Sequence, residues 1–288
     1  MVLASGSSGN CLLVEAGGSR VLVDAGLSAR RLGQRLGELG VDPAALDGVL
    51  VSHEHSDHAR GLRRFCGRHG VPVFCNLQTA DALGRGDAQV RLDWRLFQSG
   101  RDFEVGRLAV ECFAVPHDAS EPLGFALHFD GVSLGVLTDL GFASQAVLER
   151  VAGVDALLVE ANHDMRLLQD DSRRPWAVKQ RISSRHGHLS NDAAAEVVAH
   201  CAERNLKRVV LGHLSRDCNR AELARQAVAS RLQGGGIEVD VVEQDDAVLE
   251  FRVGRAQPPP GAAGRVMETP LLAGWDGGGG SSGRSVTI

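Results

Sequence analysis

The sequence contains no tyrosine, and aromatic residues make up only 4% of its 288 residues. Proteins that hold single-stranded nucleic acid by stacking its bases rely on aromatic side chains. The shortage therefore argues against a binding module that works through an aromatic platform.

Long hydrophobic runs and paired cysteines are also missing. No apolar run approaches the roughly 20 residues that a membrane span needs, and the start MVLASGSSGN lacks the features of a secretory signal. The six cysteines are scattered without a CxxC pair, so we expect buried free thiols rather than a structural zinc site. With 43% hydrophobic and 23% charged residues, the chain is predicted to be a folded, soluble, cytoplasmic protein without a membrane partner.

The net charge of −5 argues against binding of polyanions through overall charge, although it allows a local basic patch. The densest basic stretch is RRPWAVKQR, which contains Arg173, Arg174, Lys179 and Arg181, with Arg185 close behind. Lys179 and Arg181 are candidates for contacts to a phosphate backbone. A solvated basic face without a ligand explains the stretch equally well.

Strand-like runs alternate with helical spacing in both halves of the chain. Residues 11–16 and 20–24 flank a Gly-Gly-Ser turn and predict a hairpin, and leucines at helical spacing predict a helix over 28–39. A short helix is expected over 59–69, and Ser190 is expected to cap a later helix. The pattern is typical of a layered α/β fold with sheets inside and helices outside.

The character of the sequence changes after Gly254. The stretches RAQPPPGAAG and GGGGSSG lack periodicity and are rich in glycine and proline. We therefore predict one domain over residues 1–254 and a disordered tail over residues 255–288.

The segment VLVSHEHSDHARG places four metal-ligand side chains, His53, His55, Asp57 and His58, directly after an apolar run. Imidazole nitrogen and carboxylate oxygen are the ligands that zinc and similar metals prefer. In an extended segment alternate side chains point in opposite directions, so His53 and His55 share a metal only if the loop bends. The segment predicts a metal site, with two metals as the natural guess, and requires further ligands from elsewhere.

Three more apolar runs end in a ligand-type residue: AVPHD at His117, GVLTDLG at Asp139 and VVLGHLS at His213. Strand ends at one edge of a sheet deliver their side chains into a common cleft. Any one of these residues could simply cap a strand, but together with the histidine-rich segment they predict a shared site.

These segments, in this order, resemble the metallo-β-lactamase superfamily over residues 1–253. The resemblance implies a four-layer αββα sandwich, with Asp24 orienting the site from behind the ligands. It also implies two divalent metal ions, of zinc, manganese or iron. By this resemblance, one metal is held by His53, His55 and His117, the other by Asp57, His58 and His213, and Asp139 bridges the two.

Six finer motifs narrow the resemblance to the YycJ/WalJ-type exonuclease branch: LASGSSGN, TDLG, EANHD, PWAVKQRI, GHLSN and GHLSRDCN. They imply a metal-dependent phosphodiesterase, most concretely a DNA exonuclease that works in the 5′ to 3′ direction. Two cations bridged by Asp139 would lower the pKa of a shared water toward neutrality, and the hydroxide would attack phosphorus.

A proton donor for the leaving oxygen is still required, and His188 is the best candidate. It precedes a predicted helix N-terminus, where anions are stabilised, and it resembles the proton-donating histidine of tRNase Z-type relatives. Packing at a turn is the alternative role for His188. Asp57 and His163 are further catalytic candidates, and Ser7 and Asn10 lie in a loop that either cradles phosphate or only reverses the chain.

Two other functions fit parts of the sequence. The same dinuclear site could hydrolyse a small thioester or lactone, with an oxyanion leaning on one metal. A metal-binding regulator without turnover is the third hypothesis, and the complete ligand set with a candidate acid makes it the weakest.

Overall fold

A computed structural model of the chain describes residues 1–87, 89, 91–232, 236–244, 248–254 and 286–287. The predicted tail over 255–288 lies outside the described residues, apart from residues 286–287, which pair with a strand of the first sheet. All six cysteines are buried free thiols, as expected.

The first of two β-sheets is built mainly by the N-terminal third of the chain. Its strands are Val2–Ala4 (β1), Cys11–Ala16 (β2), Ser19–Val23 (β3), Gly48–Leu50 (β4), Val73–Cys75 (β5), Trp94–Leu96 (β6), Arg252–Val253 (β14) and Val286–Thr287 (β15). Their order is β14-β15-β2-β3-β4-β5-β6, with β1 paired to β2. The predicted hairpin is confirmed, since β2 and β3 pair antiparallel, and β3 to β6 run parallel.

The second sheet follows in the chain. Its strands are Phe103–Val105 (β7), Leu108–Ala114 (β8), Leu123–Phe129 (β9), Val132–Leu137 (β10), Ala156–Glu160 (β11), Arg208–Gly212 (β12) and Glu238–Val241 (β13). They lie in the order β13-β12-β11-β10-β9-β8-β7. Strands β7 to β10 pair antiparallel, and β10 to β13 pair parallel.

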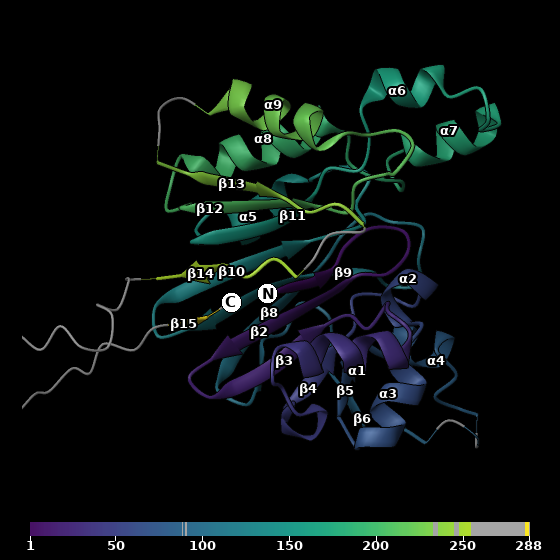
Figure 1. Cartoon of the computed structure of the whole chain (residues 1–288), viewed down its shortest axis with the longest axis vertical. Coiled ribbons are helices and arrows are strands. Elements are labelled where there is room, and N and C mark those ends of the chain that lie inside the picture. Colours follow the sequence, from purple (N-terminus) through teal and green to yellow (C-terminus); the bar gives the residue numbers. More distant parts are fainter. Residues whose placement is uncertain (88, 90, 233–235, 245–247, 255–285, 288) are drawn as a thin grey trace, which may run out of the picture.

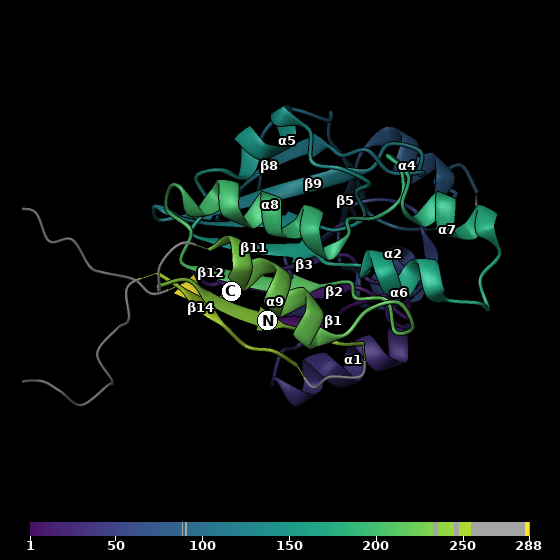
Figure 2. The ribbon, with the colours of Figure 1, turned by 90° about the horizontal axis from the view of Figure 1, so that it is seen from above.

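Helices cover the outer faces of both sheets. They are Ala29–Glu38 (α1), Ser56–Ala59 (α2), Leu62–His69 (α3), Leu77–Ala82 (α4), Gln145–Val151 (α5), Met165–Asp170 (α6), Trp176–Ile182 (α7), Asn191–Ala202 (α8) and Ala221–Arg231 (α9). Figures 1 and 2 show α8 and α9 over the second sheet, with α1 on the opposite side of the molecule. The predicted αββα sandwich is confirmed. None of the helices described is long and apolar enough to cross a bilayer.

The expected short helix over 59–69 is confirmed over Leu62–His69 (α3), but it begins three residues later than predicted, because Gly61 lies between it and α2. Gly61 presses against the preceding loop: its N–H donates to Ala25 O at 2.9 Å, and a Cβ there would lie 2.2 Å from Leu27 O. Only glycine allows so close an approach, so the segment is held by a contact that no local pattern reveals.

Three hydrophobic cores separate the four layers. Successive side chains of a strand point to opposite faces, so Leu12 and Val14 of β2 pack between the sheets. Leu13, between them, faces α1 and α3 in a second core. A third core lies between the second sheet and α8 and α9. Because both faces of each sheet are buried, the strands appear in the sequence as nearly continuous apolar runs.

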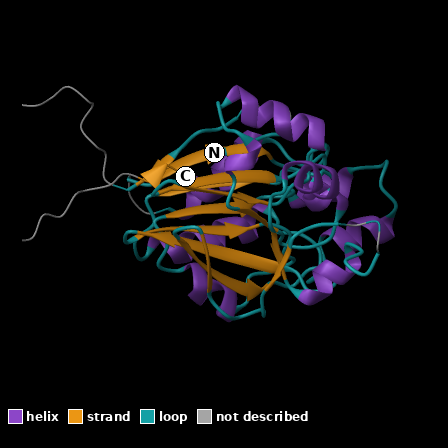
Figure 3. Cartoon of the chain, turned by 90° about the horizontal axis from the view of Figure 1, so that it is seen from below, coloured by secondary structure: helices purple, strands orange, loops and turns teal. Residues whose placement is uncertain are grey.

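Parallel strands place their carboxyl ends at one edge, and this positions the polar residues that follow them. Figure 3 shows loops gathered at one end of the strands. The loops that leave β3, β4, β10 and β12 carry Asp24, the histidine-rich segment, Asp139 and His213. Ligand sites of α/β folds are found at such carboxyl edges.

We predict that Phe125→Ala lowers the free energy of unfolding by about 3–5 kcal/mol, because the ring is fully buried on β9 between the sheets. Urea denaturation followed by circular dichroism measures the change. Leu96→Ala, on the exposed part of β6, is the control and should shift stability by about 0.5 kcal/mol or less. Equal losses in the two variants would contradict this placement of the core.

Candidate metal centre

Three residues at the carboxyl edge have left-handed backbone. Asp24, Asp139 and His213 have φ angles of 63°, 56° and 53°, and Asp130, in a hairpin turn, is the other described non-glycine residue with positive φ. This conformation is uncommon outside glycine and carries strain of roughly 1–3 kcal/mol per residue. Its concentration at the ends of β3, β10 and β12 marks this edge as a functional site.

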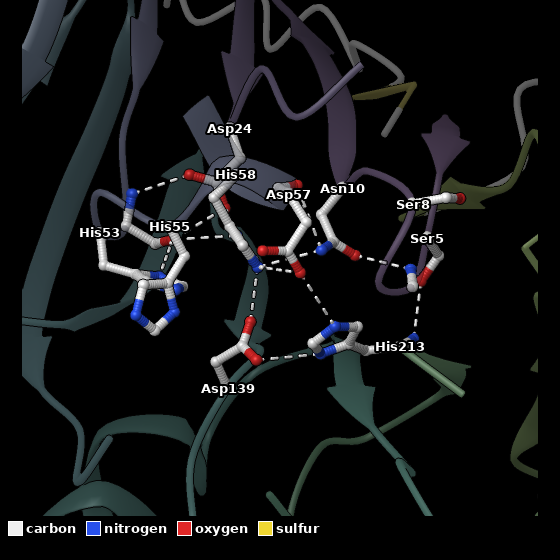
Figure 4. Close-up of polar contacts among 12 residues, drawn as sticks. Ser5, Ser8, Asn10, Asp24, His53, His55, Asp57, His58, Asp139 and His213 are labelled. Atoms are coloured by element: carbon white, nitrogen blue, oxygen red, sulfur yellow. Dashed lines mark hydrogen bonds and ion pairs between the residues drawn. The ribbon is translucent and has the colours of Figure 1, made fainter. Parts of the chain in front are cut away.

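The seven predicted ligands lie in two adjoining groups, and Figure 4 labels all of them except His117. Within each group the ligand atoms lie within 4.8 Å of one another; the groups are His53, His55 and His117, and Asp57, His58 and His213. Asp139 joins them. Its Oδ2 lies 2.6 Å from His58 Nε2, and its Oδ1 lies 3.9 Å from His117 Nε2. The structure thus brings together residues spread over 160 positions of sequence, from His53 to His213.

Asp24 fixes His58 from behind the ligands. Its Oδ2 accepts a hydrogen bond from His58 Nδ1 at 2.7 Å, and its carboxylate also accepts from the backbone N–H and the hydroxyl of Ser52, each at 2.8 Å. Ser52 Oγ lies 3.0 Å from His53 Nδ1. Both histidines therefore keep Nε2 for the site, which is how metal-binding histidines are usually oriented.

The donor set fits a metal. His53 Nε2 is buried and has no hydrogen-bond partner among the described residues, so it lacks the contact that a buried ring nitrogen needs. His117 Nδ1 donates to Gly187 O at 2.9 Å, and its Nε2 lies 3.4 Å from His55 Nδ1. Two nitrogens bound to one tetrahedral zinc at about 2.0–2.1 Å would be separated by about 3.3 Å.

Glu160 is a buried carboxylate that the sequence analysis did not identify. It ends β11, and its Oε2 lies 3.1 Å from Nδ1 of both His188 and His213. Its Oε1 accepts from the backbone N–H groups of Leu140 and Leu189 at 2.9 and 2.8 Å. Burial alone would raise the pKa of Glu160, but the two histidines outweigh it and lower the pKa to about 2. A carboxylate at the end of an apolar run was the signal that could have identified it.

The four buried histidines of the centre fall into two kinds, with lowered and with raised pKa values. Burial lowers the pKa of His53 and of His117, so both rings are neutral and can offer a lone pair. Burial also opposes charge on His58 and His213, but Asp139 and the other carboxylates around them raise each pKa to about 10. The carboxylate side of the centre therefore attracts positive charge, which cations can supply in exchange for these protons.

The predicted phosphate loop lies against the second group. Asn10 Nδ2 lies 3.0 Å from His58 Nε2, and the Asn10 backbone N–H donates to Asp57 O at 2.7 Å. Ser5 Oγ accepts from the backbone N–H of His213 at 2.7 Å. Asn10 is thus a buried neighbour of the ligands, whereas Ser7 is exposed on the same loop.

The two predicted catalytic histidines differ in position. His188, whose side chain is 24% exposed, places Nδ1 3.1 Å from Glu160 Oε2 and 3.1 Å from Asp139 Oδ1. Burial opposes its charge, but Glu160 and Asp139 raise its pKa to about 11. His163 is 1% exposed, and neither ring nitrogen has a partner among the described residues. Burial lowers its pKa to about 4.

The predicted phosphate-binding cations are engaged within the protein. Lys179 Nζ donates to Gln169 O at 2.6 Å. Arg181 Nε donates to Asp118 Oδ2 at 2.6 Å, and Asp118 directly follows His117. Ser190 caps α8 through a bond from the backbone N–H of Ala193, so that prediction is confirmed.

A sandwich of two mixed sheets with adjoining histidine and aspartate groups at its carboxyl edge defines a metallohydrolase of the metallo-β-lactamase type. The profile of the β-lactamase superfamily domain matches residues 19–214. The chain therefore belongs to this superfamily, as its motifs predicted.

Known proteins are similar over most of the chain. Exodeoxyribonuclease WalJ of Streptococcus pneumoniae is 36% identical over 246 residues, which cover 83% of this chain and 90% of that protein. Exodeoxyribonuclease YycJ of Bacillus anthracis is 37% identical over 239 residues, with the same coverage of each chain. The crystal structure of the metallo-β-lactamase fold protein YhfI from Bacillus subtilis superposes with a TM-score of 0.67 at 16% identity. It covers 84% of this chain and 95% of YhfI, and it shows the fold alone.

We predict that Glu160→Gln weakens metal binding about 10- to 100-fold, because the predicted ligand His213 loses the carboxylate that orients it. Competition with a chromophoric chelator measures the affinity directly. Asp155→Asn is the matched control: Asp155 is buried at the other end of β11 and binds Ser133 and Lys207. If both variants bound metal as the parent protein does, Glu160 would have no part in the centre.

Proposed function

We propose that the chain is a metal-dependent exodeoxyribonuclease that hydrolyses phosphodiester bonds of DNA. The observation that carries the proposal is the pair of adjoining ligand groups that share Asp139. Such an arrangement suits an in-line displacement at phosphorus, where charge builds on oxygens at both sides of the reacting atom. The relatives named exodeoxyribonuclease, at 36% and 37% identity, support DNA as the substrate.

We assign one cation to His53, His55 and His117 and the other to Asp57, His58 and His213. Zinc, manganese and iron all accept such a set of imidazole and carboxylate ligands. When bound, two such cations neutralise phosphate oxygens and lower the pKa of a water molecule. Asp57 acts in catalysis as one of these ligands, and its side chain is 21% exposed.

His188 is the proposed proton donor to the leaving oxygen. The Glu160 carboxylate accepts from His188 Nδ1, so Nε2 is the atom that can hold and deliver a proton. The negative charge of Glu160 also stabilises the imidazolium form, as the aspartate does in a catalytic triad. His163 supports this pair from the interior, since its backbone forms a bridge with Ser190 beside the same turn.

Ser7 and Asn10 are proposed to receive a phosphate at the second ligand group, and Lys179 and Arg181 to contact the strand nearby. The 5′ to 3′ direction also belongs to the proposal. The thioester or lactone hydrolase is not favoured, because the relatives reported above act on DNA by their names. Six buried free thiols support the expected cytoplasmic location, where thiols stay reduced.

We predict that the protein binds two equivalents of metal and that Asp139→Asn binds fewer. Losing the shared carboxylate removes a ligand from both positions. Elemental analysis after dialysis and reloading with Zn²⁺ or Mn²⁺ measures the stoichiometry. Bound metal should also increase the free energy of unfolding, by about 2.7 kcal/mol when its concentration is 100 times its Kd, and Tm should rise accordingly.

Asp130→Asn is the matched control, because Asp130 is an exposed aspartate with the same left-handed backbone at φ 49°. It should bind two equivalents. Full metal content in Asp139→Asn would show that Asp139 bridges nothing.

We predict that His188→Ala lowers kcat for DNA hydrolysis about 100- to 10,000-fold while metal content stays the same. The assay uses 5′- and 3′-labelled duplex and single-stranded DNA, with Zn²⁺ or Mn²⁺ added separately. His186→Ala, on the exposed neighbour of this turn, should retain activity. Turnover of a thioester or lactone without any DNA degradation would overturn the proposed function.

A further inference from the structure

A groove of about 1120 Å³ lies between the start of α1 and α3. Figure 1 shows these two helices on the outer side of the first sheet. The walls of the groove carry five exposed arginines: Arg30, Arg60, Arg63, Arg64 and Arg68. None of the residues that line it is an aspartate or a glutamate. In a chain with a net charge of −5, this is a pronounced local concentration of positive charge.

The charges of the groove differ from those of the basic stretch around α7. There, Arg173 and Arg174 pair with Asp217, each at 2.9 Å, and Arg181 pairs with Asp118. In the groove, by contrast, the arginines that bind protein atoms bind neutral carbonyl oxygens.

Arg60 Nη1 donates to Ser8 O at 3.1 Å, and Arg63 Nη2 donates to Leu83 O at 2.6 Å. These bonds hold the guanidinium groups in place without neutralising them. A fixed, uncompensated guanidinium is suited to phosphate, whose oxygens match its planar fork.

The groove adjoins the metal centre. Arg60 directly follows α2, which carries the ligands Asp57 and His58. Ser8, which Arg60 binds, belongs to the same loop as Asn10, and Asn10 contacts His58. A chain of direct contacts therefore leads from the groove to the second ligand group.

We propose that this groove binds the sugar-phosphate backbone of a nucleic acid strand whose scissile phosphate lies at the metal centre. The inference rests on the proposed function and gives that function a second, remote contact with its substrate. Contacts to phosphate carry no base information, so the grip is independent of sequence. The large apolar side chains exposed on the protein lie elsewhere, which disfavours insertion of this face into a membrane.

Charge reversal of Arg64 and Arg68 tests the proposal. The two residues lie four positions apart on α3 and so share one face of the helix. The variant Arg64→Glu/Arg68→Glu, in the full chain, is compared with Arg204→Glu/Arg231→Glu. This control alters two exposed arginines, one in the turn after α8 and one at the end of α9, and both helices lie on the opposite side of the sandwich.

Fluorescence anisotropy with a labelled 20-nucleotide single strand measures Kd in chelator-treated protein at several salt concentrations. We expect Kd to rise at least about tenfold in the groove variant, and the salt slope to fall by about 1.4 for two lost phosphate contacts. The control should bind as the parent protein does. In the metal-loaded enzyme, kcat/KM for the oligonucleotide relative to a dinucleotide should fall by a similar factor.

Arg64→Gln/Arg68→Gln removes the charges without reversing them and should weaken binding in the same direction by a smaller factor. If both groove variants bound and degraded DNA as the parent protein does, the groove proposal would be wrong, while the proposed nuclease function would stand. Loss of binding to phosphatidylserine vesicles, with oligonucleotide binding unchanged, would also overturn it. If the protein bound DNA through the groove but cleaved it with none of the metals, the groove proposal would stand and the proposed nuclease function would be wrong.

Discussion

The structure depends on the burial of carboxylates at one edge of the sandwich. Asp24, Asp139 and Glu160 are each 2% exposed or less, and buried negative charge is costly unless it is paired. Imidazole groups surround them, so each of these three carboxylates has a histidine within hydrogen-bond distance. These hydrogen bonds hold the side chains in place without a metal ion. The negative charge of the carboxylates also favours the binding of cations.

Packing in the rest of the fold offsets the backbone strain at this edge. Left-handed backbone at Asp24, Asp139 and His213 turns the chain at the strand ends and aims these side chains inward. The strain is tolerable because the strands that precede them are packed on both faces, in three separate cores. A site built on strand ends of this kind is rigid, which keeps ligands from four distant segments in register.

The apolar runs predicted the hairpin and the seven residues that the structure brings together, since each of these residues ends such a run or lies in the histidine-rich segment after one. The sandwich and the two ligand groups were implied by the family resemblance. Glu160 was missed although it also ends such a run: only the pairing of β11 between β10 and β12 shows that this glutamate is buried. The break at Gly61 was missed because its cause is a contact with the loop at Leu27. In both cases the decisive neighbour is distant in sequence, and no local pattern contains it.

The same reason explains why the sequence drew attention to the basic stretch over 173–181 and not to the arginines of the groove. The stretch over 173–181 is dense in sequence, but folding pairs its arginines with Asp118, Asp171 and Asp217. The groove draws its arginines from two segments about 30 positions apart and becomes a feature only when α1 and α3 meet. In a chain with a net charge of −5, a groove lined by five arginines attracts a polyanion locally, next to the metal centre. Because aromatic side chains are scarce, the groove would hold the strand by charge and leave its bases unread.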